Sequence, residues 1–369
     1  MANPLRIMIA CGGTGGHVFP GLATAQVLRK SGCEVILLLA GKPAEQSALK
    51  DWDGPSITVS TRAYAGSSPL SMARTSWEAW RAAMKWRQIL RAKTPMALLA
   101  MGCYASVGPV WAAHRLGVPV ILHEANVVPG RAVRLLARLA DAIALGFPEA
   151  AAHLRHMRLR VTGMPLYVPP DQGRAPPAGP PQWDWDDTVR TLLVMGGSAG
   201  AHALNKMLPQ VVRELIRAGH RLQVIHLAGR ADAPAVRLDY DRPPPVPALV
   251  MDFLDDMPFA YHRAALAVCR AGAATCAELA IYGVPALFIP YPHAAAGHQL
   301  ANARVMAGAG AAELIQENTC SVPLLRECLA GMLNEPRRLP EMRNAMRQRA
   351  RPDAAENLAE LVLLLAGGG

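Results

Sequence analysis

The chain has 369 residues, of which 51% are hydrophobic and 18% are charged. This length predicts about two domains, and the composition excludes a disordered chain. Lys and Arg outnumber Asp and Glu by 38 to 28, so the formal net charge is +10. Such an excess favours an acidic partner, which could be nucleic acid, a membrane surface or a phosphorylated substrate.

The excess of positive charge lies in the first half of the chain. Residues 1–166 contain 19 basic and 8 acidic residues, whereas residues 167–369 contain 19 and 20. The seven cysteines form no C-x-x-C pair, which disfavours a disulfide framework or a zinc site and favours a reducing cytosol. The sequence shows neither a signal peptide nor a run of about 20 apolar residues, so we expect any membrane contact to be peripheral.

The first elements in chain order predict a βαβ unit. Residues 5–11 are typical of a buried strand, 12–16 of a glycine loop, 20–31 of a helix and 34–40 of a second strand. The pattern is repeated by a strand at 191–195, a loop at 196–200, a helix at 203–218 and a strand at 222–228. The sequence therefore predicts an α/β protein with two Rossmann-like units.

Proline-rich segments mark the boundaries between these elements. Residues 167–187 cannot sustain a helix or a central strand, and we interpret them as a domain boundary with a surface loop. A second proline run at 243–247 precedes a predicted strand at 248–251, and Asp256 is a candidate cap for a helix that starts near Met257. Residues 352–366 predict a terminal amphipathic helix.

The first glycine loop is the strongest candidate for chemistry. Glycines between a strand and a helix let the backbone approach a ligand, and the free N–H groups of a helix start favour anions. The loop lacks the spacing of a dinucleotide-binding motif and the lysine of a Walker loop, and a plain tight turn is the alternative. His17 closes the loop and is a candidate general base, although most isolated histidines are structural.

Two later junctions resemble the first one in composition. The loop at 196–201 follows the strand of the second unit, and the small residues at 269–277 form a third strand-to-helix junction. Glu278 lies one turn into that helix, where a carboxylate can accept hydrogen bonds from the hydroxyls of a ribose. The alternative is a tightly packed small-residue helix on which Glu278 is only solvated.

Four motifs occur in order and resemble those of glycosyltransferase family 28, in the branch that acts in peptidoglycan synthesis. They lie at 12–21 (GGTGGHVFPG), 123–126 (HEAN), 196–201 (GGSAGA) and 272–278 (GAATCAE). The resemblance spans about residues 5–350. It implies a GT-B fold, with two Rossmann-like domains facing across a cleft: an acceptor domain at 1–164 and a donor domain at 165–349. A helix at 350–369 would pack back on the first domain.

The resemblance also implies an activity and its partners. Members of the family transfer N-acetylglucosamine from UDP-GlcNAc to the C4 hydroxyl of muramyl-pentapeptide on undecaprenyl diphosphate, with inversion at the anomeric carbon. We therefore expect UDP-GlcNAc and a polyprenyl-diphosphate lipid as partners, no cofactor and no metal. The expected location is the cytoplasmic face of the cell membrane, at an anionic surface.

The site residues follow from the resemblance, position by position. His17 would be the base or the group that orients the attacking hydroxyl, and Glu278 would hold the ribose. The other donor-binding positions are Thr14, Gly15 and Gly16, which would line the cleft against the sugar and acceptor, Asn126 and Gln299 for the donor sugar, Ser198 for the diphosphate, Leu254 for uracil, and Ala273, Ala274, Thr275, Cys276 and Ala277 for the diphosphate-facing turn. Tyr167 stands where the family usually has a phosphate-binding arginine, and the acidic residue usually found just before the glutamine is absent.

Residues 62–93 are a basic stretch with interleaved aromatic residues. They contain seven basic residues and one acid, and Trp77, Trp80 and Met84 share one helical face. With Arg81, Lys85 and Arg87 they are typical of a membrane interface, which we favour. Packing of the tryptophans in the core is the second interpretation, and nucleic-acid binding is the third, so we expect no nucleic-acid partner.

The sequence is also compatible with other functions. A related glycosyltransferase with a different acceptor or nucleotide-sugar donor fits the departures from the family pattern. A non-catalytic protein that binds a nucleotide sugar or a lipid is the alternative from another class, and an NAD-dependent dehydrogenase is disfavoured by the glycine spacing.

Overall fold

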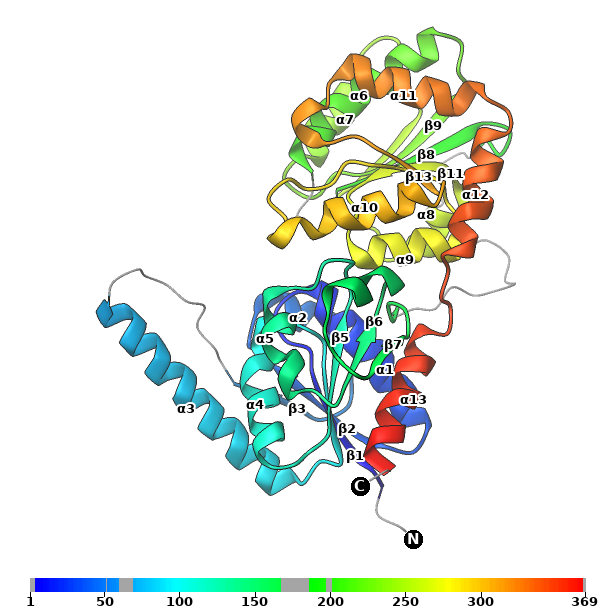
Figure 1. Ribbon diagram of the computed structural model, residues 1–369. Coiled ribbons are helices and arrows are strands. Elements are labelled where there is room, and N and C mark those ends of the chain that lie inside the picture. Colours follow the sequence, from blue (N-terminus) through cyan, green and yellow to red (C-terminus); the bar gives the residue numbers. More distant parts are fainter. Residues whose placement is uncertain (1–3, 51, 60–68, 167–185, 197–200, 368–369) are drawn as a thin grey trace. The chain divides into compact units, whose positions relative to one another are not determined.

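The computed structural model describes residues 4–50, 52–59, 69–166, 186–196 and 201–367 (Figure 1). For residues 43, 44, 47 and 69–80 only the backbone is described. The chain forms two compact units, of which unit 1 comprises Met1–Pro169 with Arg351–Gly369 and unit 2 comprises Pro170–Ala350. The boundaries expected from the sequence, at 164/165 and 349/350, lie close to these limits.

Unit 1 contains a parallel seven-stranded sheet with the strand order β3-β2-β1-β4-β5-β6-β7. Its strands are β1 (Arg6–Ala10), β2 (Glu34–Leu39), β3 (Ser56–Thr58), β4 (Ala97–Ala100), β5 (Val120–Glu124), β6 (Ala142–Leu145) and β7 (Leu159–Val161). Its helices are α1 (Gly15–Lys30), α2 (Pro43–Ala48), α3 (Pro69–Lys93), α4 (Val107–Arg115), α5 (Arg131–Leu136) and α13 (Ala354–Gly367), with short 3₁₀ turns η1 (Tyr104–Ser106), η2 (Ala137–Leu139) and η3 (Pro148–His153).

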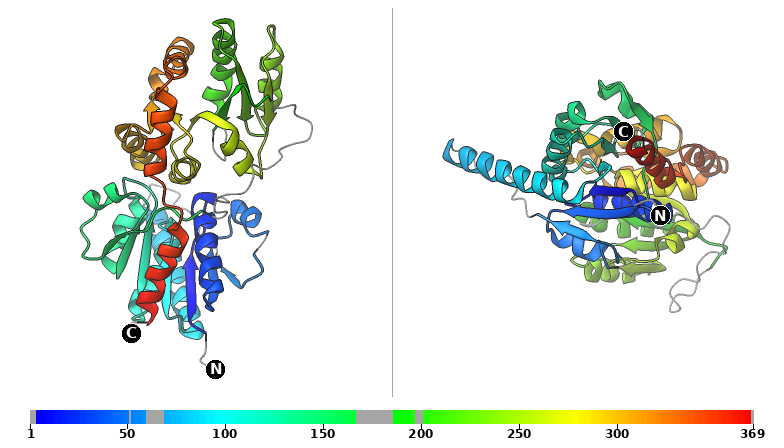
Figure 2. Two further views of the ribbon diagram at one scale, coloured as in Figure 1. Left: turned by 90° about the vertical axis from the view of Figure 1, so that its right-hand side faces the viewer. Right: turned by 90° about the horizontal axis from the view of Figure 1, so that it is seen from below.

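Both faces of the first sheet are covered, which explains the apolar runs in its central strands, such as residues 7–10 of β1 and all of β4. Ile7 and Ile9 of β1 pack with α1 and α13 on one face, and Met8 and Ala10 pack with α3 and α4 on the other. Figure 2 shows α13 beside α1, where the buried Leu358 joins the α1 side of the core. The C-terminal helix is thus an integral part of unit 1.

Unit 2 contains a parallel six-stranded sheet with the order β10-β9-β8-β11-β12-β13. Its strands are β8 (Arg190–Met195), β9 (Leu222–Leu227), β10 (Ala248–Met251), β11 (Ala264–Cys269), β12 (Ala286–Phe288) and β13 (Ala312–Leu314). Its helices are α6 (His202–Arg217), α7 (Ala233–Asp241), α8 (Met257–Arg263), α9 (Ala273–Tyr282), α10 (His298–Gly308), α11 (Val322–Asn334) and α12 (Arg338–Gln348), with η4 (Ala295–Gly297) and η5 (Glu317–Thr319).

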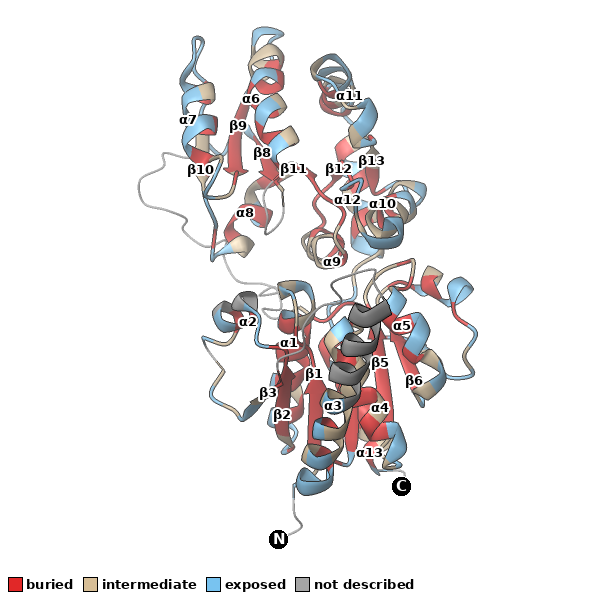
Figure 3. Ribbon diagram, turned by 90° about the vertical axis from the view of Figure 1, so that its left-hand side faces the viewer, coloured by how far each residue is buried: buried red, intermediate tan, exposed pale blue. Residues whose placement is uncertain are grey.

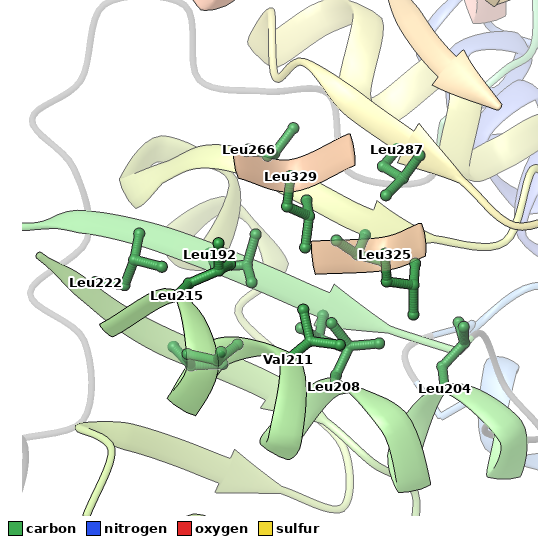
Figure 4. Packing of buried hydrophobic residues seen from close by; sticks show 14 of the residues in the cluster. Leu192, Leu204, Leu208, Val211, Leu215, Leu222, Leu266, Leu287, Leu325 and Leu329 are labelled. Atoms are coloured by element: carbon green, nitrogen blue, oxygen red, sulfur yellow. The ribbon is translucent and has the colours of Figure 1, made fainter. Parts of the chain in front are cut away.

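The core of unit 2 is built from one stripe of α6 and the sheet beneath it. Leu204, Leu208, Val211 and Leu215 recur at helical spacing and are all buried in one cluster. Figure 4 shows this stripe directed at Leu192 and at the α11 residues that complete the cluster. Figure 3 shows this packing in both units: the strands are buried, and the helices are exposed on the face that points away from the sheet.

The structure confirms the two parallel α/β units predicted from the sequence and corrects one helix start. The first helix begins at Gly15, five residues before the predicted start at Pro20. The N–H groups of His17 and Val18 both donate to the Thr14 carbonyl, at 3.0 and 3.1 Å, and close the first turn. Pro20 lies inside the helix, where it removes only one backbone hydrogen bond, so the proline does not set the helix start.

The strand orders also locate where ligands bind in such sheets. In each sheet the order reverses next to the first strand of the unit, between β1 and β4 and between β8 and β11. Ligands of open α/β sheets bind outside the carboxyl ends of the strands at this reversal point. The first glycine loop follows β1, and the 269–277 junction follows β11, so both lie at a reversal point.

Candidate active site

The first glycine loop is held against the end of β2 by close backbone contact. A Cβ atom added to Gly12 would lie 2.5 Å from the Ala40 nitrogen, so only glycine fits there. Gly13 has φ +125°, a conformation that other residues rarely adopt. The two glycines therefore serve the tight path of the loop, which delivers Thr14 to the N-cap of α1.

His17 lies on the first turn of α1 and is paired with Thr14. Its Nδ1 atom lies 2.9 Å from the Thr14 hydroxyl, and its side chain is half-buried. This hydrogen bond fixes the orientation of the ring, which a general base requires. The predicted residues Thr14, Gly15, Gly16 and His17 are thus brought together at one helix start.

A second histidine lies near His17, at the end of β5. The buried His123 ring donates its Nε2–H to the Gly163 carbonyl at 3.0 Å, because a carbonyl oxygen can only accept. Burial lowers the pKa of His123 to about 4, and the neighbouring His17 imidazole adds to this effect. His123 is therefore neutral at physiological pH.

Asn126 is positioned by the buried carboxylate of Glu124. One oxygen of Glu124 accepts from the Asn126 backbone N–H at 2.8 Å and from its side-chain amide at 3.2 Å. The other oxygen accepts from the Gly130 N–H at 2.8 Å. The sequence identifies the motif that contains both residues, but gives Glu124 no role; the structure shows that it fixes the loop that carries Asn126.

In unit 2, the helix α9 starts with a turn of small side chains. Gly272 is the N-cap, Ala273 and Cys276 are buried, and Ala274, Thr275 and Ala277 are half-buried. Burial raises the pKa of the Cys276 thiol, so this sulfur is a neutral packing group. The first N–H groups of such a helix have no intrahelical acceptor and favour an anion.

Glu278 is not the solvated residue of the alternative interpretation. It is half-buried, and its carboxylate accepts a hydrogen bond from the Tyr261 hydroxyl at 2.6 Å. Burial raises the pKa of Glu278 to about 7, and the Tyr261 hydrogen bond opposes this shift. Tyr261 is a buried residue of α8 that the sequence gives no reason to select.

Gln299 and Leu254 lie at other loops of unit 2. The Gln299 side-chain carbonyl accepts from the Tyr291 N–H at 2.9 Å, which orients the side chain. The buried Leu254 follows β10, which is separated from β11 by two strands, or about 14 Å at the usual strand spacing. The positions predicted to bind the donor, from Leu254 to the start of α9, thus span a distance across the strands that is comparable to the length of a nucleotide.

The matches to known families and proteins cover almost the whole chain. Residues 7–145 match the glycosyltransferase family 28 N-terminal domain and residues 191–358 match the glycosyltransferase family 28 C-terminal domain. A relative from Brucella canis is 34% identical over 369 residues, which cover 100% of this chain and 96% of the relative. The chain belongs to glycosyltransferase family 28.

The names and structures of these family 28 relatives describe one enzyme. The Brucella canis protein is named UDP-N-acetylglucosamine--N-acetylmuramyl-(pentapeptide) pyrophosphoryl-undecaprenol N-acetylglucosamine transferase. The crystal structure of Acinetobacter baumannii MurG is 30% identical, with a TM-score of 0.81 over 98% of this chain and 100% of that one. The chain therefore has the GT-B fold of the family 28 glycosyltransferases.

A more distant structure shows the fold alone. The UDP-GlcNAc 2-epimerase from Neisseria meningitidis, solved with UDP-GlcNAc bound, is 12% identical and has a TM-score of 0.67 over 98% of this chain and 100% of that chain. At this identity the shared fold does not decide the reaction. Assignment to family 28 rests on the closer relatives.

Several predicted family 28 positions fall where the structure gives no description. Ser198 and Tyr167 lie outside the described residues, and so do the side chains of Trp77 and Trp80. Within the described ranges no group of His, Cys, Asp and Glu side chains is arranged to hold a metal ion. None of the described helices combines the length and the apolar character that a membrane span requires.

Residues 69–93 of the basic stretch form α3, and one of its tryptophans belongs to the core. Trp86 is 2% exposed, and a Cβ atom on Gly108 of α4 would lie 2.7 Å from its ring. Arg81 and Lys85 are exposed, whereas Met84 and Arg87 are half-buried. The core interpretation therefore holds for Trp86, and exposed basic residues lie on the same helix.

Proposed function

We propose that this chain transfers N-acetylglucosamine from UDP-GlcNAc to the C4 hydroxyl of undecaprenyl-diphosphate-linked muramyl-pentapeptide. The observation that carries the proposal is the 34% identity, over the full chain, to a relative named for this transfer. The described geometry supports it with a histidine at the reversal point of unit 1 and a carboxylate at that of unit 2. UDP-GlcNAc is a substrate in this proposal, and no cofactor or metal takes part.

The acceptor half of the reaction is assigned to His17. In the tautomer that carries its proton on Nδ1, His17 donates to the Thr14 hydroxyl, and Nε2 holds the lone pair that takes the proton of the acceptor hydroxyl. The hydroxyl oxygen then attacks the anomeric carbon from the face opposite to the diphosphate. The bond from the anomeric carbon to the diphosphate breaks, and UDP leaves with the electron pair, so the configuration inverts.

The donor half is assigned to unit 2. Glu278, as a carboxylate, accepts hydrogen bonds from the two ribose hydroxyls, while the N–H groups at the start of α9 stabilise the negative charge that develops on UDP. Asn126 and Gln299 bind sugar hydroxyls, Ser198 the diphosphate and Leu254 the uracil. These roles come from the family positions and are part of the proposal.

An assay of the purified protein tests the proposed reaction. Radiolabelled UDP-GlcNAc is incubated with the lipid acceptor in detergent, and we expect label in the lipid fraction and release of UDP. Replacement of UDP-GlcNAc by UDP-glucose or by another nucleotide sugar tests the rival donors. Transfer from one of these in preference to UDP-GlcNAc, or binding of the donor without any transfer, contradicts the proposal.

We also propose that α3 binds the cytoplasmic surface of the membrane, where the lipid acceptor is embedded. The support is the pair of exposed cations Arg81 and Lys85 beside the half-buried Met84, on a helix anchored to the core by Trp86. In this arrangement cations contact anionic head groups and apolar side chains enter the acyl boundary.

Vesicle binding measures this interaction. Each basic residue near an anionic surface contributes about 1 kcal/mol, so Arg81→Ala with Lys85→Ala is expected to weaken binding to anionic vesicles by about 30-fold. High salt should weaken the wild type similarly. The control removes two exposed cations of unit 2, by Arg217→Ala with Arg221→Ala. Equal losses for both pairs would refute a specific role of α3.

A further inference from the structure

A buried carboxylate lies beneath the first glycine loop. Glu45, on the short helix α2, is only 2% exposed. Its Oε1 atom accepts hydrogen bonds from the backbone N–H of Gly13 at 2.6 Å and from that of Ala40 at 3.2 Å. Its Oε2 atom accepts from the N–H of Gly41 at 2.8 Å. Three backbone N–H groups, from two segments of the chain, thus meet at one side chain.

Helix capping accounts for only one of these contacts. Glu45 lies in the first turn of α2, and its bond to Gly41, directly before the N-cap Lys42, resembles the return bond of a capping box. Gly13 and Ala40 lie outside that helix start. Gly13 belongs to the loop after β1, and Ala40 directly follows β2. The carboxylate therefore joins the glycine loop to the end of the neighbouring strand.

Glu45 supplies this loop with a negatively charged acceptor, which glycine loops elsewhere take from a bound anion. Loops between a strand and a helix bind phosphate through their backbone N–H groups. In this loop the N–H of Gly13 already donates to Glu45, at a short distance that is typical of a charged acceptor. A phosphate oxygen at Gly13 would have to displace a buried carboxylate and would be repelled by its charge.

We propose that Glu45 is a positioning residue that acts as a built-in anion for the first glycine loop. It fixes the loop in the conformation that carries Thr14 and His17, and it closes the Gly13 N–H to phosphate groups of a ligand. The loop then binds the uncharged sugar part of the acceptor and the diphosphates are bound elsewhere. The catalytic part of this inference rests on the proposed function.

The effect on catalysis follows from the path of the chain. Gly13 immediately precedes Thr14, and the Thr14 hydroxyl lies 2.9 Å from Nδ1 of His17. A loop released from Glu45 shifts both groups together, and a misplacement of about 1 Å is enough to reduce turnover about a hundredfold. Donor binding by unit 2 does not depend on this loop. The expected signature is a fall in kcat that exceeds any rise in KM for UDP-GlcNAc.

Chemical rescue of Glu45→Ala tests the built-in anion directly. The substitution removes the carboxylate and leaves space for acetate. We expect kcat to fall by about tenfold to a hundredfold, and acetate, but not chloride at equal ionic strength or the neutral acetamide, to restore most of it. Glu34→Ala is the matched control, because Glu34 lies at the opposite end of β2 in an ion pair with Arg6. It should retain activity and show no response to acetate.

A second variant and a second measurement keep the test decisive. Glu45→Gln keeps one carbonyl acceptor, so we expect a smaller loss of kcat if Glu45→Ala does not fold. The NMR signals of the His17 ring, assigned by their absence in His17→Gln, should shift in both variants and return with acetate in Glu45→Ala. This measurement needs no turnover, so it tests the inference even if the wild type does not transfer N-acetylglucosamine.

Two results would overturn the inference. In the first, His17 signals and kcat are the same as in the wild type in both variants. In the second, kcat falls but KM for UDP-GlcNAc rises in parallel and acetate has no effect, which is the behaviour of a generally loosened unit.

Discussion

Both units place a carboxylate beside a strand-to-helix junction, but the two carboxylates have different partners. Glu45 approaches the first glycine loop from a separate helix and accepts from the backbone N–H groups of Gly13, Ala40 and Gly41. Glu278 lies on the helix of its own junction and accepts from the side-chain hydroxyl of Tyr261. Glu45 thus holds backbone N–H groups in place, whereas Glu278 is itself held by one side chain.

This difference separates a positioning group from a ligand-binding group. A carboxylate oxygen has two acceptor sites, and Glu45 uses both of its oxygens for the chain itself. Burial raises the pKa of Glu278 to about 7, which means that its charged form lacks full compensation by the protein. Perturbed groups of this kind are characteristic of functional sites, and ribose hydroxyls would supply the missing donors.

The largest effect is expected at the histidine that the first loop carries. His17→Gln removes the proposed base, and loss of general-base catalysis reduces kcat by about a hundredfold to ten-thousandfold. Donor affinity, measured by calorimetry with UDP-GlcNAc, should not change, because Glu278 and Tyr261 remain. The control His114→Gln replaces an exposed histidine of α4. Wild-type kcat in His17→Gln would show that the loop has no role in proton transfer.

An intermediate effect is expected at the carboxylate of unit 2. Glu278→Gln removes a charged acceptor for the ribose, at a cost of about 1.5–3 kcal/mol, or roughly a tenfold to hundredfold increase in KM for UDP-GlcNAc. KM for the lipid acceptor should stay the same. Glu313→Gln, which alters a half-buried carboxylate of β13 paired with Arg338, serves as the control. A change in acceptor KM instead of donor KM would reverse the assigned roles of the two junctions.

The fold could be predicted from the sequence because its determinants are local. Runs such as 7–10 and 35–39 are apolar at every position, which is typical of parallel strands covered on both faces. The helix start that the sequence predicts, at Pro20, is five residues too late. In the structure Thr14 is the N-cap and α1 begins at Gly15, so Pro20 lies within the helix.

The two carboxylate sites could not be predicted in full because their partners are distant in the chain. Glu45 lies 32 residues from Gly13, and Tyr261 lies 17 residues from Glu278. No local pattern marks either contact, which exists only after the helices pack beside the strands. The sequence points to Glu278 because this residue ends a motif, whereas Tyr261 and Glu45 belong to none of the four motifs.

The smallest effect is expected for Tyr261→Phe, and pH is the variable that reveals it. With a pKa of about 7, Glu278 is partly protonated near neutral pH, and the protonated form has lost part of its capacity to accept from ribose. KM for UDP-GlcNAc should therefore rise as the pH falls through about 7. The Tyr261 hydrogen bond lowers the pKa of Glu278, so its loss should move this rise to higher pH and weaken donor binding about fivefold at neutral pH.

The stability of the same variants gives an independent check with a defined sign. The pKa of Glu278 is raised from 4.5 to about 7 in the folded protein, so the folded state binds more protons than the unfolded state between these values. The contribution of Glu278 to stability is thus fully present below about pH 4.5 and is lost as the pH rises to about 7. Glu278→Gln should flatten this part of the denaturation profile, whereas Tyr261→Phe should extend it to higher pH. If neither the KM profile nor the stability profile changes in Tyr261→Phe, the Tyr261 hydroxyl does not control the pKa of Glu278. The proposed difference between Glu278 and Glu45 would then be refuted.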